Sequence, residues 1–291
     1  MNNSIGFIGL GLLGTPMAEH ILKNNFKLFV WGRNPDKLLP FTKQGAIIAD
    51  SAQALAEQVD IIILCVTDEI AVEAVLFAEA GILAAKRTGQ IIVDHSTILP
   101  AAVKPIADKV TASGRHFIDA PVTGGVRGAI NSALTIFAGG EAGNLEKVRP
   151  ILSLYSAKIN HMGESGCGQA MKMCNQVMVL NTHILVHEAL NFAKYQNLDV
   201  NKVLSAFEGS FADSKLLQFM GKAAYGSTPD NIAHIKTFMK DLQLMQATAE
   251  RVHSKLYITD TTAKLINTLM EKNYGEKELA EIKRLYMDQE L

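Results

Sequence analysis

The run IGFIGLGLLG (Ile5–Gly14) lies near the start of the chain, and in it an apolar, strand-like segment leads into a glycine-rich turn. The last six residues fit the pattern G-x-G-x-x-G: Gly9, Leu10, Gly11, Leu12, Leu13 and Gly14. After a strand and before a helix, this pattern is typical of a turn that holds the pyrophosphate of a dinucleotide. The first glycine permits a tight turn, the second admits the phosphates, and the third allows close helix packing. We predict a cofactor site here; a tight turn without a ligand is the alternative.

Strand-like and helical runs alternate from the first residues to about residue 163, which predicts a doubly wound, mostly parallel α/β sheet of the Rossmann type. The continuous apolar run Ile61–Val66 (IIILCV) suits a strand that is covered on both faces. The other strand candidates are Ser4–Gly9, Lys27–Trp31, Gln90–Asp94, Phe117–Asp119 and Leu134–Ala138.

After residue 163 the strand patterns mostly disappear, and Gln169–Tyr195 is predicted to form one long helix that is apolar nearly all round. A helix of this kind is normally buried within a larger helical assembly. We therefore predict two domains: residues 1–163 bind the cofactor, and residues 164–291 form an all-helical domain for substrate binding and dimerisation that begins with the long linking helix.

Composition sets further limits. The net charge of −1 over 291 residues gives no field that would attract nucleic acid or an anionic membrane. Apolar runs stay far below the roughly 18 residues that span a bilayer, and the N-terminus does not resemble a signal peptide. The three cysteines lie in apolar segments and are interpreted as small buried hydrophobes in a reducing compartment. These features predict a cytoplasmic protein.

The second predicted strand ends in Val30-Trp31-Gly32-Arg33-Asn34. An acidic side chain at this place would bind the ribose 2′-hydroxyl of NAD. The sequence instead has Arg33, whose guanidinium pairs well with the 2′-phosphate of NADP. We predict a preference for NADP(H), with NAD(H) still possible; a solvated surface arginine is the alternative.

Three further segments follow in order: DHST (Asp94–Thr97), DAPVTGG (Asp119–Gly125), and GCGQAMKMCN (Gly166–Asn175). Together with the N-terminal turn they resemble the β-hydroxyacid dehydrogenase family, with its motifs D-x-S-T, D-A-P-V-S-G-G and G-x-G-x-x-x-K-x-x-N. The resemblance covers essentially the whole chain. It implies reversible hydride transfer between NADP(H) and a small hydroxy acid or semialdehyde acid.

The first group of site residues implied by this resemblance binds the cofactor and the substrate carboxylate. Val66, Thr67 and Thr97 match positions beside the cofactor, and Ser96 lies beside the substrate. Thr123, Gly124 and Gly125 match the segment that holds the carboxylate, since consecutive N–H groups in a glycine bend form an anion site. Capping of turns is the alternative for these residues.

The second group lies on the long helix and farther along the chain. Lys172 is the implied general acid and base, because a lysine in a closed apolar site can exchange a proton with a carbonyl oxygen. Asn175 is implied to orient the lysine or substrate, and Gln176 is a second candidate for substrate contact. In a later segment, FMKDL, Lys240 is implied to reach the cofactor and Asp241 the substrate end.

Relatives pair through their helical domains, so the resemblance also implies a homo-oligomer, either a dimer or a tetramer. No metal site is predicted, because His183 and His187, although four apart on a helix, suit packing better than zinc binding. Two other functions stay open: an imine reductase of the same architecture, which typically lacks the lysine, and a protein that binds the dinucleotide without turnover.

Overall fold

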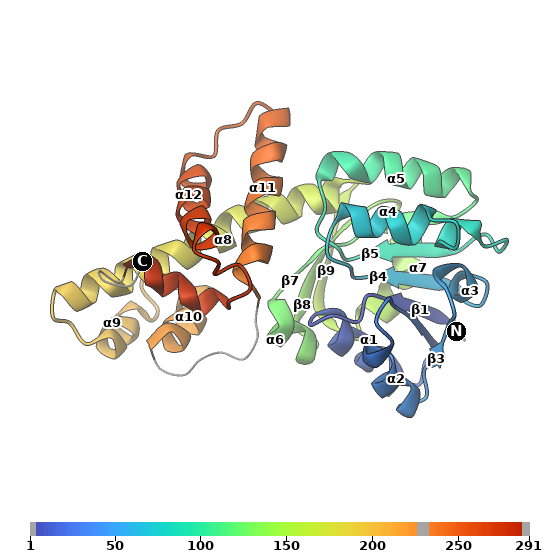
Figure 1. Ribbon diagram of the computed structural model, residues 1–291, viewed down its shortest axis with the longest axis horizontal. Helices are drawn as coiled ribbons and strands as arrows, with labels where there is room; N and C mark the ends of the chain where they lie inside the picture. The colour runs from blue at the N-terminus through green and yellow to red at the C-terminus, as the bar shows by residue number, and fades with distance from the viewer. Residues whose placement is uncertain (1–3, 226–232, 287–291) are drawn as a thin grey trace. The chain divides into compact units, whose positions relative to one another are not determined.

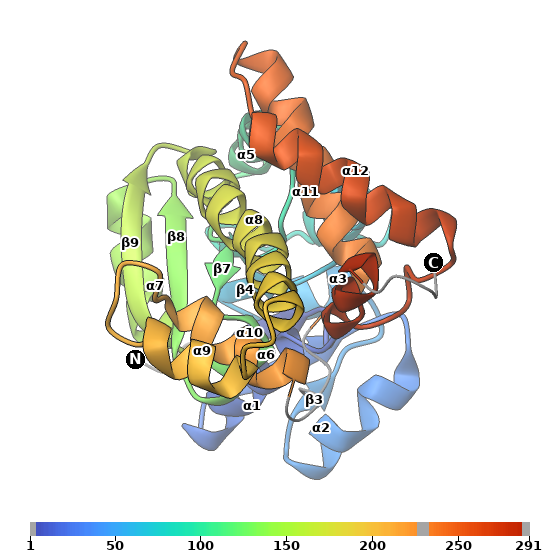
Figure 2. The ribbon, with the colours of Figure 1, turned by 90° about the vertical axis from the view of Figure 1, so that its left-hand side faces the viewer.

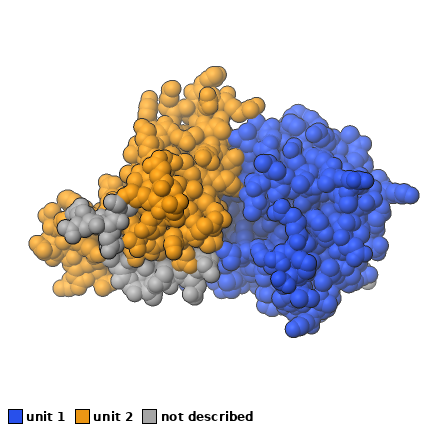
Figure 3. Space-filling view, viewed as in Figure 1, with its two compact units in different colours: residues 1–172 blue, residues 173–291 orange. Residues whose placement is uncertain are grey.

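The computed structural model describes residues 4–225 and 233–286; residues 287–291, the end of the predicted helical domain, lie outside the described part. The chain divides into two compact units, residues 1–172 and 173–291, which Figure 3 shows in different colours. The first unit is built on a sheet and the second on helices, so the fold class predicted from the sequence is confirmed.

Nine strands of the described chain form one sheet in the order β3-β2-β1-β4-β5-β6-β8-β7, with β9 paired to β8. The strands from β3 to β6 are parallel, whereas β8 runs antiparallel to both β6 and β7. The bounds are β1 Ile5–Ile8, β2 Leu28–Trp31, β3 Ile47–Ile48, β4 Ile61–Leu64, β5 Ile91–Asp94, β6 His116–Asp119, β7 Val122–Thr123, β8 Leu134–Gly139 and β9 Ser156–Gly163. The chain crosses over from β3 to β4, which pairs with β1 on the side opposite β2, and open α/β sheets bind their ligands at such a switch point.

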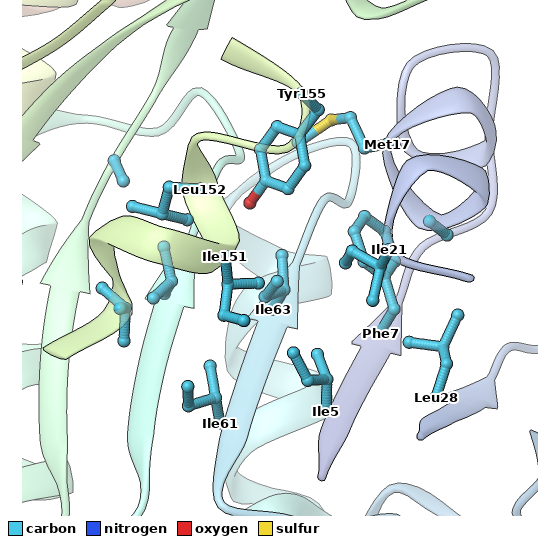
Figure 4. Close-up of a cluster of buried hydrophobic side chains, with 14 of the residues drawn as sticks. Ile5, Phe7, Met17, Ile21, Leu28, Ile61, Ile63, Ile151, Leu152 and Tyr155 are labelled. Carbon is cyan, nitrogen blue, oxygen red and sulfur yellow. The ribbon is translucent and has the colours of Figure 1, made fainter. Parts of the chain in front are cut away.

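Helices cover both faces of this sheet (Figure 1). They are α1 Gly14–Lys23, α2 Leu39–Lys43, α3 Ala52–Ala56, α4 Glu69–Phe77, α5 Pro100–Ala112, α6 Gly125–Ile130 and α7 Ala142–Leu152. Because side chains alternate along a strand, Ile61 and Ile63 enter one core while Ile62 and Leu64 enter the other. Figure 4 shows the first core, where side chains of α1 and α7 pack against β1 and β4. Burial on both faces explains why these strands are continuously apolar.

The register of the parallel strands aligns the carboxyl ends of β1, β4, β5 and β6 with one another. Ile8 pairs with Leu64, Leu64 with Asp94, and Asp94 with Asp119. The residues that follow each strand therefore meet at the same edge of the sheet. This edge collects the glycine turn and the segments DHST and DAPVTGG, which are far apart in sequence.

The second unit is organised around the long helix α8, Cys167–Tyr195, which begins in the first unit. Its other elements are α9 Val200–Phe207, α10 Lys215–Tyr225, α11 Ile235–Arg251, α12 Tyr257–Glu271 and the 3-10 helix η3 Leu279–Tyr286. Figure 2 shows α11 and α12 side by side. Leu180 and Ile184 of α8 pack with α11 and α12, whereas Val186 and Leu190 pack with α9 and α10. Two separate cores on one helix explain its wide apolar surface.

Candidate active site

The glycine turn after β1 has the form that a dinucleotide needs. At Gly9, φ is +107°, and a Cβ would lie 2.2 Å from the carbonyl oxygen of Cys65, at the end of the neighbouring strand. At Gly14, a Cβ would lie 2.0 Å from the carbonyl oxygen of Gly9. These two glycines are required by the protein's own packing.

Gly11 is different, because a Cβ there would meet no atom within 4 Å and its backbone does not need the left-handed region. The fold gives no steric reason for a glycine at this position, whereas a closely approaching phosphate would. Among the described residues, no side chain caps the first turn of α1. Its N–H groups thus fit the pyrophosphate of a dinucleotide. Of the remaining turn residues, Leu10 is buried, Leu13 is half-buried and Leu12 is exposed.

The ends of β4 and β5 are joined through Ser96. Its hydroxyl oxygen accepts a hydrogen bond from the N–H of Val66 at 3.0 Å, and its own N–H donates to Asp94 at 2.9 Å. Ser96 is buried, while Val66 and Thr97 are half-buried and Thr67 is exposed. The structure therefore brings the predicted cofactor and substrate residues of these two loops together, and Ser96 fixes one loop against the other.

The neighbouring His95 is held as a neutral, structural side chain. Its Nδ1 lies 2.6 Å from the carbonyl oxygen of Ala120, which can only accept, so Nδ1 carries the proton. Nε2, 2.9 Å from the Tyr155 hydroxyl, then accepts a hydrogen bond. Burial lowers the pKa of His95 to about 4. With both ring nitrogens engaged, His95 ties β5 to the segment after β6 and is poorly suited to proton transfer.

The bend after β7 requires glycine at two successive residues. Gly124 has a φ of +122° and Gly125 a φ of +61°, and both follow the half-buried Thr123. Side chains rarely adopt such angles, which explains the glycine pair. The bend lies at the carboxyl edge of the sheet, where its N–H groups can form a concavity for an anion.

Lys172 lies beside this bend. Its Nζ donates to the carbonyl oxygen of Val122 at 3.0 Å, and Val122 directly precedes Thr123. Only 7% of the Lys172 surface is exposed. Burying an ammonium group is costly, and lysine is almost never fully buried unless it is paired. The structure thus brings the predicted acid–base residue and the predicted carboxylate segment together within the first unit.

The other predicted residues form a polar chain within the second unit. Asn175 donates through Nδ2 to Oε1 of Gln176 at 2.9 Å, and Gln176 donates through Nε2 to Oδ2 of Asp241 at 2.6 Å. Lys240 pairs with Oδ1 of Asp241 at 3.2 Å. Asp241 and Gln176 are buried. The amide of Gln176 is therefore engaged by its neighbours, which favours Asn175 as the amide that orients a ligand.

Several other sequence expectations meet the structure here. Arg33 is exposed and lies two residues after β2 ends. His183 and His187 are buried in α8, and burial lowers the pKa of each to about 4. The prediction that all three cysteines are buried was wrong: Cys65 and Cys167 are half-buried, and Cys174 is exposed on the side of α8 that also carries the exposed Met178.

Sequence reasoning missed two residues that the structure places at the centre of this region. Asp119 accepts hydrogen bonds from the first turn of α8, and Gln169 connects that turn to the segment after β5. Both are fully buried. Asp119 is the single charged residue at the end of an apolar strand, and this feature of the sequence could have identified it as a site residue.

Comparisons with known proteins agree with this arrangement. Residues 4–163 match the NAD-binding domain of 6-phosphogluconate dehydrogenase, and residues 166–286 match the NAD-binding domain of NADP-dependent 3-hydroxyisobutyrate dehydrogenase. The chain is 37% identical over 266 residues to 2-hydroxy-3-oxopropionate reductase of Escherichia coli strain K12, covering 91% of this chain and 90% of the relative. It is 32% identical over 285 residues to mitochondrial 3-hydroxyisobutyrate dehydrogenase of Drosophila melanogaster, covering 95% and 87%.

The fold is also that of a solved 3-hydroxyisobutyrate dehydrogenase from Salmonella typhimurium, with a TM-score of 0.88, 22% identity, and coverage of 97% of this chain and 99% of the other. The fold and the site define an oxidoreductase that uses a nicotinamide dinucleotide and acts on a CH–OH group. The chain belongs to the β-hydroxyacid dehydrogenase family. Among the described residues, no helix is long and apolar enough to cross a membrane.

The contrast between the glycines gives a direct test of the cofactor turn. We expect Gly11→Ala to keep the melting temperature of the ligand-free protein within about 2 °C, because its Cβ meets nothing. The added methyl should weaken NADPH binding about tenfold or more by holding the phosphates away from the backbone. Differential scanning fluorimetry and a fluorescence titration measure the two effects.

The control for this test is Gly143→Ala on α7, where the nearest atom to a new Cβ is Oε1 of Glu141 at 3.4 Å. It should leave both quantities unchanged. Undiminished NADPH binding by Gly11→Ala would show that no phosphate approaches this residue.

Proposed function

We propose that the protein catalyses reversible hydride transfer between NADP(H) and a small hydroxy acid or the matching semialdehyde acid, with Lys172 as the general acid and base. The observation that carries the proposal is the buried amine of Lys172, hydrogen-bonded at 3.0 Å to the residue before the Thr123–Gly125 bend. A proton donor beside an anion-binding bend suits a substrate that carries a carboxylate close to its reacting carbon.

The roles of the chain's own residues follow from this geometry. The dinucleotide supplies or accepts the hydride when it is bound at the Gly9–Gly14 turn. The Thr123 hydroxyl and the N–H groups of Gly124 and Gly125 bind the carboxylate and thereby orient the carbonyl carbon. Lys172 gives a proton to the carbonyl oxygen during reduction and removes one from the hydroxyl during oxidation. While charged, Lys172 also stabilises the negative charge that develops on this oxygen.

The substrate class and the direction rest on two features. A relative at 37% identity is named for the reduction of 2-hydroxy-3-oxopropionate, a small acid with a carbonyl group. Arg33 favours the 2′-phosphate of NADPH, the nucleotide that cells commonly use for reduction. We infer reduction of a small semialdehyde acid as the physiological direction.

Two other functions fit less well. An imine reductase of this architecture typically lacks a lysine at this position, and reduction of a cyclic imine faster than glyoxylate or succinic semialdehyde would favour it. A sensor that binds the dinucleotide without turnover has no need for a buried lysine, whose burial is costly. Tight NADPH binding without oxidation by any of a broad panel of carbonyl acids would favour the sensor.

The stripe of exposed apolar residues on α8 supports self-association through the helical unit. Met178, Leu185 and Phe192 are 70%, 55% and 65% exposed. They recur every seven residues, so they share one side of the helix. Large apolar side chains on one side of a helix favour an interface. We propose that two or more copies of the chain pair through this stripe.

The acid–base role predicts the effect of removing the amine. Lys172→Ala should lower kcat by roughly 10²–10⁴-fold, because the proton transfer loses its partner. NADPH should bind within about threefold of the wild type, since the turn of Gly9–Gly14 is unchanged. Steady-state assays with glyoxylate, succinic semialdehyde and related acids, together with NADPH titrations, measure both. The control is Lys104→Ala, which removes an exposed lysine on α5. A kcat within tenfold of the wild type for Lys172→Ala would refute the acid–base role.

The cofactor preference depends on one guanidinium group. Arg33→Ala should reduce the NADPH/NADH ratio of kcat/KM by about 10–100-fold, as expected for the loss of a charge-assisted pair with the 2′-phosphate. The matched control is Arg149→Ala, whose guanidinium pairs with Glu146 on α7. An unchanged ratio in Arg33→Ala would mean that this arginine does not read the 2′-phosphate.

The α8 stripe predicts the assembly. Light scattering of the wild type should give at least twice the 31.6 kDa chain mass. Leu185→Glu combined with Phe192→Glu should shift the protein toward the single chain, because charges would be buried in the interface. Ile70→Glu, at an 80% exposed residue of α4, is the control and should keep the assembly. A double variant of unchanged size would place the interface elsewhere.

A further inference from the structure

The carboxylate of Asp119, at the end of β6, binds the beginning of α8 with both oxygens. Oδ1 accepts from the N–H of Gly166 at 2.8 Å, and Oδ2 accepts from the N–H of Gln169 at 2.9 Å. The first N–H groups of a helix have no carbonyl partner within the helix. Asp119 thus satisfies them from another part of the chain, and its charge is favourable beside the positive end of the helix.

The first turn of α8 is pressed directly against the sheet. A Cβ at Gly168 would lie 2.5 Å from the carbonyl oxygen of Phe137 on β8 and 2.6 Å from that of Asp119. A glycine is therefore required at this residue by the packing of the helix on the strand ends. The carboxylate can reach two N–H groups at once because the helix comes this close.

Gln169 supplies a second connection from the same turn. Its Nε2 donates to the carbonyl oxygen of Ser96 at 2.7 Å, and its Oε1 accepts from the N–H of Ile98 at 3.3 Å. The side chain is fully buried. The start of α8 is thus fixed to the ends of β5 and β6 from two sides, and Lys172 follows Gln169 by one helical turn.

We propose that Asp119 is a positioning residue that sets the placement of the first turn of α8 on the sheet and thereby holds the Lys172 amine at the Val122 carbonyl oxygen. The proposal deepens the proposed function and rests on it for its effect on catalysis. Asp119 need not contact substrate or cofactor. It acts through the single helical turn that runs from Gln169 to Lys172.

The chemistry of the side chain explains why an aspartate is needed. Burial raises the pKa of Asp119 to about 6, whereas its hydrogen bonds from backbone N–H groups act in the opposite direction. A carboxylate offers two acceptor oxygens to two donors. An asparagine offers one acceptor and one NH₂ donor, so one backbone N–H would face another donor. The near-isosteric change Asp119→Asn therefore removes the double attachment without changing the volume.

The test compares Asp119→Asn with Arg115→Met, which alters a buried polar residue at the opposite end of the same strand. Arg115 donates to Gln90 and to the carbonyl oxygens of Ala85 and Arg87, so its loss should lower the melting temperature. These hydrogen bonds go to residues outside α8, so the change should leave kcat near the wild-type value. Asp119→Asn should lower kcat by 10–100-fold, with KM and NADPH affinity within about threefold.

A second readout does not depend on the enzyme's activity. Brief labelling with acetic anhydride, followed by peptide mass spectrometry, measures the accessibility of Lys172 relative to the exposed Lys104. Asp119→Asn should raise the labelling rate of Lys172 at least fivefold, whereas Arg115→Met should not. If Asp119→Asn does not fold, Gly168→Ala takes its place, because the added Cβ pushes α8 away while the charge stays.

The outcomes separate the two proposals. Unchanged labelling of Lys172 in Asp119→Asn overturns the positioning role, whatever happens to kcat. Increased labelling with unchanged kcat supports the positioning role but removes Lys172 from the chemistry. The wild type could also reduce none of the carbonyl acids. In that case the proposed function fails, while increased labelling of Lys172 in Asp119→Asn still supports the positioning role.

Discussion

The close approach of the first turn of α8 to the strand ends is the constraint on which the candidate site depends. The N–H groups of Gly166 and Gln169 donate to the Asp119 carboxylate at 2.8 and 2.9 Å. The helix and the strand ends are so close at Gly168 that no side chain fits there. This contact determines where Lys172 emerges, one turn farther along the helix. The lysine then reaches the carbonyl oxygen of Val122, which lies on β7. A buried amine can be held at a fixed point only when the backbone that carries it is itself fixed.

The glycines of the chain show how one residue type serves separate purposes. Gly9 and Gly14 are required because neighbouring backbone lies within 2.2 Å of any added Cβ, so they belong to the packing of β1, β4 and α1. A Cβ at Gly11 meets nothing within 4 Å, so the packing of the chain does not itself require a glycine there. Gly168 looks similar in sequence to a glycine that admits a ligand, yet the carbonyl oxygen of Phe137 occupies the space. A glycine motif alone cannot distinguish these cases, because the neighbours that decide them are distant in sequence.

The sequence predicted the parts of the fold that depend on local pattern. The run Ile61–Val66 gave a buried parallel strand, and the structure places β4 at Ile61–Leu64 with both faces covered. Strand β9, Ser156–Gly163, was not predicted, since it lies at the edge of the sheet and its side chains are mostly exposed. An exposed edge strand lacks the apolar pattern that identifies an interior one. The pairing of Asp119 with Gly166 spans 47 residues, and no local pattern encodes it.

The amide pair on α8 illustrates how distant contacts decide a role that sequence left open. Helical spacing placed both Asn175 and Gln176 near the side of Lys172, and either could have faced a ligand. In the structure the Gln176 amide lies between Asn175 and the buried Asp241, at 2.9 and 2.6 Å. Its donor and acceptor are both used, and releasing it would leave a buried carboxylate oxygen without that partner, which is costly. Gln176 therefore serves best as the connection that fixes Asn175 to Asp241 on α11.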